Sequence, residues 1–256
     1  MGVRPVLVET VGDVSVITLN RPASLNALNT HLLTELVGAL REVQSCGAIV
    51  IQGEGRAFCA GEDLNETLAP ETGTADELRV AFSQLQDLTR LMAGAPCPVV
   101  SAVHGYAIGG GAEIALTADF VIGGPAARLK FPEAVIGHAP TGGITARLPL
   151  LVGALRAKDL LLTGRWVDPK EGLDIGLFTE IHESPKVRAL ELATELASYP
   201  RRSQAAVKRA VELALVPAQE TYLQLEIDLA SYCFESAETE ASFDTFRNRK
   251  GLSANS

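Results

Sequence analysis

The sequence predicts an α/β fold followed by an α-helical C-terminal region. In the first two thirds of the 256-residue chain, short β-branched segments alternate with amphipathic segments, which is typical of strands and helices packed in layers. Beyond residue 142 the helical period dominates. The length is sufficient for one large domain with an appendage, so we expect an α/β core over residues 1–186 and a helical region over 187–256.

Residue types and turn signals place the first elements. Residues 3–10 and 13–19 are rich in β-branched residues and meet at a Gly-Asp turn, which predicts a hairpin. Asn29 can cap an amphipathic helix that runs to about residue 44. We expect the next elements to be a strand over 48–52, a loop over 53–75, a helix over 76–93, a strand over 98–103, a helix over 110–117, and strands over 119–123 and 128–131.

The C-terminal part of the chain carries mostly helical patterns. One short β-branched segment interrupts them. We expect helices over 142–151, 154–163, 168–174, 186–198, 201–214 and 217–236, a strand over 177–182, and a last helical piece before Arg247.

Composition argues against several classes of partner. The formal net charge of -9 lacks the basic footprint that phosphate backbones need, so we expect no nucleic-acid partner. The 4 cysteines form no C-x-x-C pair, which favours reduced thiols in the cytoplasm. The 4 histidines lack the spacing of metal ligands, so we expect no metal site. No apolar run approaches the ~20 residues that span a bilayer, so we expect no membrane partner.

The first candidate site is the glycine run Gly109-Gly110-Gly111, which leads into a helical segment containing Glu113. Glycines leave backbone N–H groups accessible, and a helix N-terminus attracts negative charge. The run is not a G-x-G-x-x-G motif, and no Lys-Ser/Thr follows, so neither dinucleotide nor P-loop binding is indicated. A tight strand-to-helix connection without a ligand explains the glycines equally well.

The second candidate is the loop over residues 53–64, which follows the strand predicted over 48–52. Open α/β sheets bind ligands at the carboxyl ends of their strands. The alternative is a surface loop in which Phe58 is an apolar plug and Glu62 and Asp63 are solvated acids.

The third candidate is Glu133, which follows Pro132 among apolar residues. A single glutamate is usually a solvated surface residue. Burial would raise the pKa of this carboxyl and make it an effective proton donor, and the same argument applies to Glu113. Two acids near free backbone N–H groups are the parts needed for proton transfer beside a developing oxyanion.

Several segments, taken in chain order, form a specific set that covers nearly the whole chain. They are Leu19-Asn20-Arg21-Pro22 with Asn26-Ala27-Leu28, Ala57-Phe58-Cys59-Ala60-Gly61-Glu62-Asp63-Leu64, Gly105-Tyr106-Ala107-Ile108-Gly109-Gly110-Gly111-Ala112-Glu113, Phe131-Pro132-Glu133, Leu161-Leu162-Thr163-Gly164-Arg165 and Asp174-Ile175-Gly176-Leu177. As a set they resemble the enoyl-CoA hydratase/isomerase (crotonase) superfamily, and most closely its enoyl-CoA hydratases.

The resemblance implies a spiral of ββα units followed by a helical region that mediates trimerisation, often as a dimer of trimers. It implies an acyl-CoA thioester as substrate, with coenzyme A as part of that substrate and no separate cofactor. Two backbone N–H groups would polarise the thioester carbonyl, and they map onto Glu62 and Gly110. The side chain of Glu62 would then be incidental.

Relatives that resemble hydratases carry glutamates at the positions of both Glu113 and Glu133. We expect Glu113 to deprotonate water for attack on the β-carbon and Glu133 to supply the α-proton, with sharing of both roles as the alternative. The resemblance also places Arg21 near the CoA phosphates. The residues expected to contact the rest of CoA or the acyl group are Leu25, Ala60, Asp63 and Leu64.

Two positions depart from the family pattern. Thr141 stands where many hydratases have glycine and some isomerases have aspartate, which argues against those isomerases. His138 is unusual in this loop, and we interpret it as a partly buried structural histidine rather than an acyl contact. Double-bond isomerisation and non-catalytic CoA binding stay open as alternatives, because fold does not fix function.

Overall fold

The computed structural model describes residues 4–63 and 75–234. Its strands are β1 (Val6–Val11), β2 (Val14–Leu19), β3 (Ala48–Gly53), β4 (Ala57–Cys59), β5 (Val99–Val103), β6 (Tyr106–Ile108), β7 (Phe120–Gly123), β8 (Arg128–Lys130) and β9 (Glu180–Ile181). Its α-helices are α1 (Thr30–Glu42), α2 (Ala75–Ala93), α3 (Gly110–Thr117), α4 (Ile144–Val152), α5 (Ala154–Thr163), α6 (Pro169–Asp174), α7 (Pro185–Ala197), α8 (Arg201–Leu215) and α9 (Gln219–Phe234).

Two sheets organise the described residues. A 6-stranded sheet has the order β1-β2-β3-β5-β7-β9, and a 3-stranded sheet has the order β4-β6-β8. The β1–β2 hairpin is antiparallel as predicted, and the other strand pairs are parallel. Parallel strands need a crossover connection, and α2 and α3 supply such crossovers.

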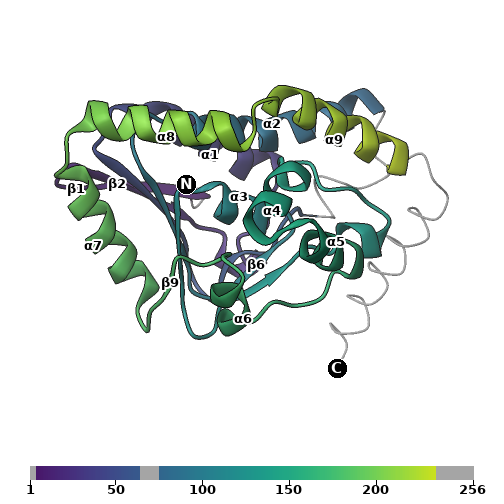
Figure 1. Cartoon of the computed structure of the whole chain (residues 1–256), viewed down its shortest axis with the longest axis horizontal. Coiled ribbons are helices and arrows are strands. Elements are labelled where there is room, and N and C mark those ends of the chain that lie inside the picture. The colour runs from purple at the N-terminus through teal and green to yellow at the C-terminus, as the bar shows by residue number, and fades with distance from the viewer. Residues whose placement is uncertain (1–3, 64–74, 235–256) are drawn as a thin grey trace.

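The chain repeats a strand–strand–helix unit. The units are β1-β2-α1, β3-β4-α2, β5-β6-α3, and then β7-β8 followed by the 3-10 helix Glu133–Ile136. From the second unit on, the first strand joins the large sheet and the second strand joins the small one. This succession confirms the predicted arrangement of ββα units, and the pairing of β6 with β8 places the β6–α3 turn beside the end of β8. In Figure 1, α7 lies on the left of the molecule and α4 and α5 lie on the right.

The large sheet is covered on both faces, because its central strands are apolar on both sides. In β3, Ile49 and Ile51 face the core that includes α1, while Val50 faces α7. Asn29 caps α1 by accepting a hydrogen bond from Leu32 N at 2.9 Å, as predicted. The predicted boundary at residue 187 falls inside α7, which packs Ala189 and Ala193 on the sheet.

The smallest strands escape prediction. Residues 53–75 were expected to be a loop, yet they contain β4, and β6 lies where only a glycine-rich turn was expected. Three-residue strands carry too few side chains to show an alternating pattern. Leu64, the loop over 65–74 and the helical piece before Arg247 lie outside the described residues. Within the described ranges, no helix is both long and apolar enough to cross a membrane.

Candidate active site

The first acid, Glu113, lies in the first turn of α3 and is 2% exposed. Neither carboxylate oxygen accepts a well-formed hydrogen bond from a described residue, and a weak contact with the Gly142 backbone offsets only part of the rise in its pKa. Gly142 lies directly against this carboxyl, because a Cβ added to Gly142 would overlap Glu113 Oε2. The backbone of another loop therefore forms one wall around the acid.

The second acid, Glu133, opens the 3-10 helix that follows β8 and is 8% exposed. Its Oε2 is buried without a partner among the described residues. Gly109 has φ +52, and a Cβ there would lie 2.7 Å from Glu133 Oε1. A glycine is therefore needed where the turn before α3 passes the Glu133 carboxyl. That turn brings Glu133 beside the helix that carries Glu113.

Electrostatics confirm that the acids share one buried environment. Burial raises the pKa of Glu113 well above its usual range, and the negative charges of Glu133, Glu226 and Glu62 raise it further. Burial also raises the pKa of Glu133 to about 8, with smaller contributions from Glu62 and Glu226. The predicted shift at both acids is therefore present, with desolvation as its main cause.

Backbone geometry leaves the two predicted N–H groups available. Leu28 donates to Gly61 O at 2.8 Å and accepts from Asp63 N at 2.9 Å. In such a parallel bridge the intervening residue, Glu62, points its N–H away from Leu28. Gly110 is the first residue of α3, where the N–H has no acceptor within the helix. Neither N–H donates to another described group.

The loop that walls Glu113 is held by two helices. From α2, Gln86 Nε2 donates to Thr141 O at 3.1 Å, and Thr89 Oγ1 donates to Gly142 O at 2.6 Å. From α9, Glu226 accepts from Gly143 N at 2.6 Å. Glu226 also accepts from both the N–H and the hydroxyl of Thr145, at the start of α4.

Sequence reasoning missed Glu226 as a support of the site. A signal for it exists, because Leu223, Glu226, Ile227 and Ala230 form one buried stripe at helical spacing, and Glu226 is its only charged member among these described residues. A carboxylate within an apolar stripe is expected to have a partner.

The residues predicted to contact CoA lie close together, but they also bind one another. The Arg21 guanidinium donates to Ala27 O at 2.6 Å and pairs with the Asp63 carboxylate at 3.3 Å. Ala60 N donates to Leu25 O at 3.0 Å. Arg21 and Asp63 therefore form an internal ion pair, and the predicted contacts with CoA stay predictions.

His138 is buried, as interpreted from sequence. Its ring meets Phe82 edge-on, with centroids 5.3 Å apart, and its Nδ1 contacts the backbone carbonyl of Ala139. Burial lowers the pKa of His138 to about 4, so the ring is neutral near neutral pH.

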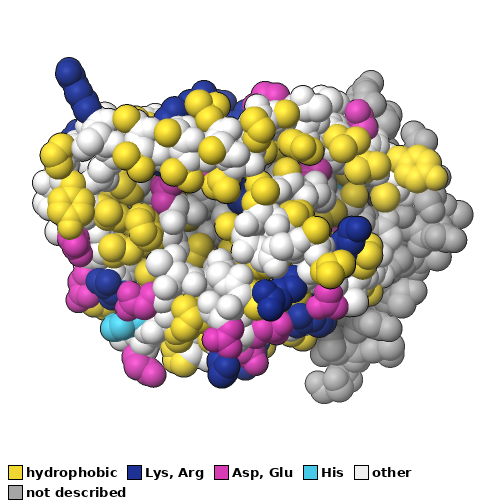
Figure 2. Space-filling model, in the orientation of Figure 1, with side chains coloured by type: hydrophobic (Ala, Val, Ile, Leu, Met, Phe, Trp, Pro, Cys, Tyr) yellow, Lys and Arg dark blue, Asp and Glu magenta, His cyan; other side chains and the backbone are white. Residues whose placement is uncertain are grey.

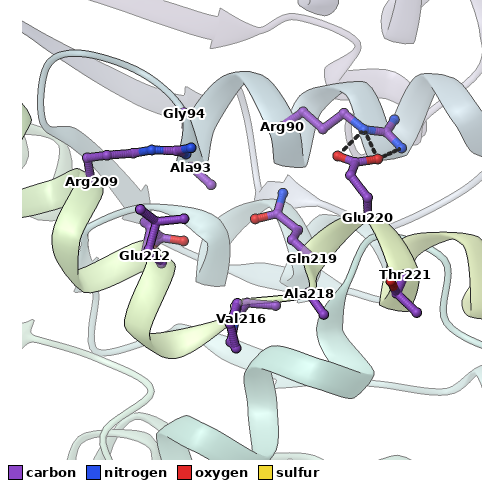
Figure 3. Close-up of a pocket in the computed structure, with 12 residues that line it drawn as sticks. Arg90, Ala93, Gly94, Arg209, Glu212, Val216, Ala218, Gln219, Glu220 and Thr221 are labelled. Carbon is purple, nitrogen blue, oxygen red and sulfur yellow. Dashed lines mark hydrogen bonds and ion pairs between the residues drawn. The ribbon is translucent and has the colours of Figure 1, made fainter.

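A separate pocket of about 570 Å³ opens between α2, α8 and α9, where Arg90 pairs with Glu220 at 2.9 Å (Figure 3). No predicted site residue within the described ranges lines it. The described residues also contain no group of three His, Cys, Asp or Glu side chains arranged to hold a metal ion.

Comparison with known proteins places the chain in a family. A sequence profile named Enoyl-CoA hydratase/isomerase matches residues 9–253. The chain belongs to this family. Among solved structures, an enoyl-CoA hydratase/isomerase from Mycobacterium paratuberculosis is similar with a TM-score of 0.89 and 27% identity, over 94% of this chain and 98% of that one.

Two curated relatives show the range of reactions in the enoyl-CoA hydratase/isomerase family. A probable enoyl-CoA hydratase of Rhizobium meliloti is 37% identical over 84% of this chain and 85% of its own length. The 1,2-epoxyphenylacetyl-CoA isomerase of Escherichia coli is 31% identical, over 91% of both chains. Family membership therefore supports an acyl-CoA thioester as substrate.

Proposed function

We propose that the chain is an enoyl-CoA hydratase, which adds water reversibly across the 2,3 double bond of a trans-2-enoyl-CoA thioester. The observation that carries the proposal is a pair of buried carboxyls with unpartnered oxygens, Glu113 and Glu133, beside two available backbone N–H groups. The hydratase names among its relatives support the same reaction. The reaction needs water and the thioester, and no cofactor.

The Glu62 and Gly110 N–H groups are proposed to bind the thioester oxygen. As water attacks C3, negative charge moves onto this oxygen, and two aligned donors stabilise that charge more than they stabilise the substrate carbonyl. The N-terminal end of α3 adds its dipole at the same point. Loss of one such donor typically costs ~3 kcal/mol in the barrier.

The two acids are proposed to carry out the two proton transfers of the reaction. Glu113 takes a proton from water as the new C3–O bond forms, and Glu133 gives a proton to C2. With its pKa at about 8, Glu133 is mostly protonated near neutral pH and can donate. The pKa of Glu113 is raised as well, so the pair shares its protons, and the ionised form of Glu113 is the active base.

Proton exchange at C2 separates the two roles. A saturated thioester such as butyryl-CoA cannot be hydrated, but its C2 proton can exchange with deuterated water if an acid–base group faces that carbon. We expect Glu113→Gln to keep this exchange and Glu133→Gln to lose it, as followed by NMR. Exchange that depends on Glu113 alone would reverse the assignment.

Double-bond isomerisation is the second candidate, because the family to which the chain belongs is named for both hydratases and isomerases of enoyl-CoA. One carboxyl can move a proton between two carbons of an acyl chain. Incubation of a 3-enoyl-CoA in deuterated water tests it. A shifted double bond without a hydroxyl product would favour the isomerase, whereas loss of crotonyl-CoA absorbance with formation of 3-hydroxybutyryl-CoA would favour the hydratase.

Binding of the CoA portion is proposed to involve Arg21, Leu25, Ala60 and Asp63. Arg21 is 18% exposed at its side chain and pairs with Asp63. A cytoplasmic location is part of the proposal, and the 4 cysteines, all free thiols, are consistent with it.

Self-association as a trimer, or as a dimer of trimers, is also proposed. Helices α8 and α9 display apolar side chains on the surface shown in Figure 2, and the family resemblance assigns the C-terminal helices to assembly. The exposed large apolar residues of these helices include Val207, Val211, Leu213, Leu225, Leu229 and Tyr232. Apolar surface of this kind favours contact between copies of the chain.

A further inference from the structure

The proposed mechanism uses the backbone N–H of Glu62 and leaves its side chain without a role. Among the described residues, this carboxyl accepts one hydrogen bond, from Thr141 Oγ1 at 3.4 Å. Burial raises the pKa of Glu62 to about 7, and the hydrogen bond from Thr141 opposes this shift only in part. Glu62 is half-buried, so its carboxyl loses part of its water and receives one long hydrogen bond from a neutral hydroxyl in return.

Glu226 is a buried glutamate with a structural role, and it serves as a comparison for Glu62. Its carboxylate is 1% exposed and accepts hydrogen bonds from Gly143 N, Thr145 N and Thr145 Oγ1. Glu62 is half-buried and has one described hydrogen bond, so it lies between Glu226 and the pair Glu113 and Glu133, whose buried oxygens have no described partner. A carboxyl placed only to join two loops would be expected to have partners like those of Glu226.

The Glu62 carboxyl lies close to the proposed oxyanion donor and to the loop beside Glu113. A glutamate carboxyl can lie no more than about 5 Å from its own backbone nitrogen, so this group is close to the proposed site of the thioester oxygen. Its partner Thr141 precedes Gly142, which lies against Glu113. The Glu62 charge also acts on both Glu113 and Glu133. The Glu62 carboxyl therefore lies near enough to both acids for its charge to act on them.

We infer that the Glu62 side chain contacts the acyl group and selects thioesters that carry a hydrogen-bonding substituent, such as a hydroxyl, a carbon or two beyond the double bond. The inference rests on the proposed function, because it assumes that the thioester oxygen binds at the Glu62 N–H. A plain alkyl chain would displace water from the carboxyl without replacing its hydrogen bonds, whereas a hydroxyl would replace them. An acyl carboxylate would be repelled by the charges of the site.

Binding of unreactive thioesters tests this without turnover. Titration calorimetry would compare 4-hydroxybutyryl-CoA with butyryl-CoA on the wild type, Glu62→Gln and Glu62→Met. Both variants keep the backbone N–H. We expect the wild type to bind the hydroxylated thioester at least about 10-fold more tightly. Glu62→Gln, whose amide can still hydrogen-bond, should keep most of this preference, and Glu62→Met, of similar length, should lose it.

Glu54→Met is the matched control, because Glu54 is an exposed acid on the turn before β4 and is not among the charges that act on Glu113 and Glu133. The same substitution there should leave the ratio of affinities unchanged. The inference would be overturned if the affinities of the wild type for the two thioesters differed by less than about 2-fold, or if Glu62→Met kept the preference for the hydroxylated thioester. Hydration of crotonyl-CoA, measured separately, would show that the proposed function stands in either case. A chain that binds neither thioester would overturn both.

Discussion

Two buried carboxyls lower the stability of the folded protein when they are ionised. Glu113 and Glu133 lose water on folding and gain no described hydrogen bond to their buried oxygens, so both contribute unfavourably when ionised. A fold selected for stability alone would replace them with amides or apolar residues. Their presence fits a site that keeps its acids unsatisfied until a substrate arrives.

The stability of the protein should show this cost as a function of pH. Because the folded pKa of Glu133 is raised from 4.5 to about 8, the folded state holds a proton that the unfolded state has released in this window. The unfolding free energy therefore falls as pH rises from about 4.5 to 8, and it is lowered most above 8.

Glu133→Gln removes this penalty. We expect the variant to exceed the wild type in unfolding free energy by about 1–3 kcal/mol at about pH 9, and by much less at about pH 5. Urea denaturation at the two pH values measures the difference. If the variant gains the same unfolding free energy at both pH values, or more at the lower pH, the Glu133 carboxyl ionises normally in the folded protein.

The charge of Glu62 should influence the catalytic pH profile. The groups that act on Glu113 and Glu133 are the acids Glu62, from the segment after β4, and Glu226, from α9. Removing the Glu62 charge stabilises the ionised forms of both catalytic acids, so Glu62→Gln should move both limbs of the kcat/KM profile to lower pH. Limbs that stay in place or move upward would show that the Glu62 charge does not act on the two acids.

Glu113 and Glu133 were predictable at this scale because each stands beside glycine or proline in an apolar segment. The Glu62 side chain was expected to be incidental, which stays a prediction, and the structure places its carboxyl 3.4 Å from the Thr141 hydroxyl. No sequence pattern links positions 62 and 141, because their contact depends on how two loops from different units meet.

At the scale of elements, the site depends on the loop between the 3-10 helix Glu133–Ile136 and α4. Helices α2 and α9 bind its backbone through Gln86, Thr89 and Glu226, and this fixes Gly142 against Glu113. The start of α4 was predicted to within two residues. The hydrogen bonds that hold the loop were not predicted, because they come from helices that are distant in sequence.

Gly142→Ala tests whether the contact between Gly142 and Glu113 holds the acid in place. Its new Cβ would overlap Glu113 Oε2, so the acid must move away from the substrate. We expect kcat to fall about 100-fold, since a displacement near 1 Å has this effect, with a smaller change in KM. Steady-state hydration kinetics measure both.

Gly38→Ala is the matched control for Gly142→Ala. Gly38 lies within α1, and a Cβ there meets nothing within 4 Å. This variant should keep full activity and gain about 0.5–1 kcal/mol of stability, because alanine favours the helix. Equal losses of activity in the two variants would mean that Gly142 has no special place beside Glu113.

At the scale of the whole molecule, repetition of the ββα unit builds the site. The parallel pairing of β6 with β8 places the β6–α3 turn, which carries Gly109, beside Pro132 and Glu133. The alternation of strands and helices was enough to predict this class of fold. The division of strands between two sheets was not predicted, because β4, β6 and β8 have three residues each.

Assembly is the prediction that belongs to this scale. With a chain mass of 27.1 kDa, sedimentation equilibrium should give a mass three or six times larger at micromolar concentration. The exposed apolar residues of α8 and α9 would then be buried between copies. A concentration-independent monomer would contradict the assembly and leave the chemistry of the site unaffected.

Hydration of crotonyl-CoA, followed by the loss of enoyl thioester absorbance, tests the central claim most directly. We expect wild type to be active, and both Glu113→Gln and Glu133→Gln to fall by about 100-fold or more. If the two acids act as a unit, the double variant should fall little further than either single one. Hydration that survives both substitutions would contradict the account.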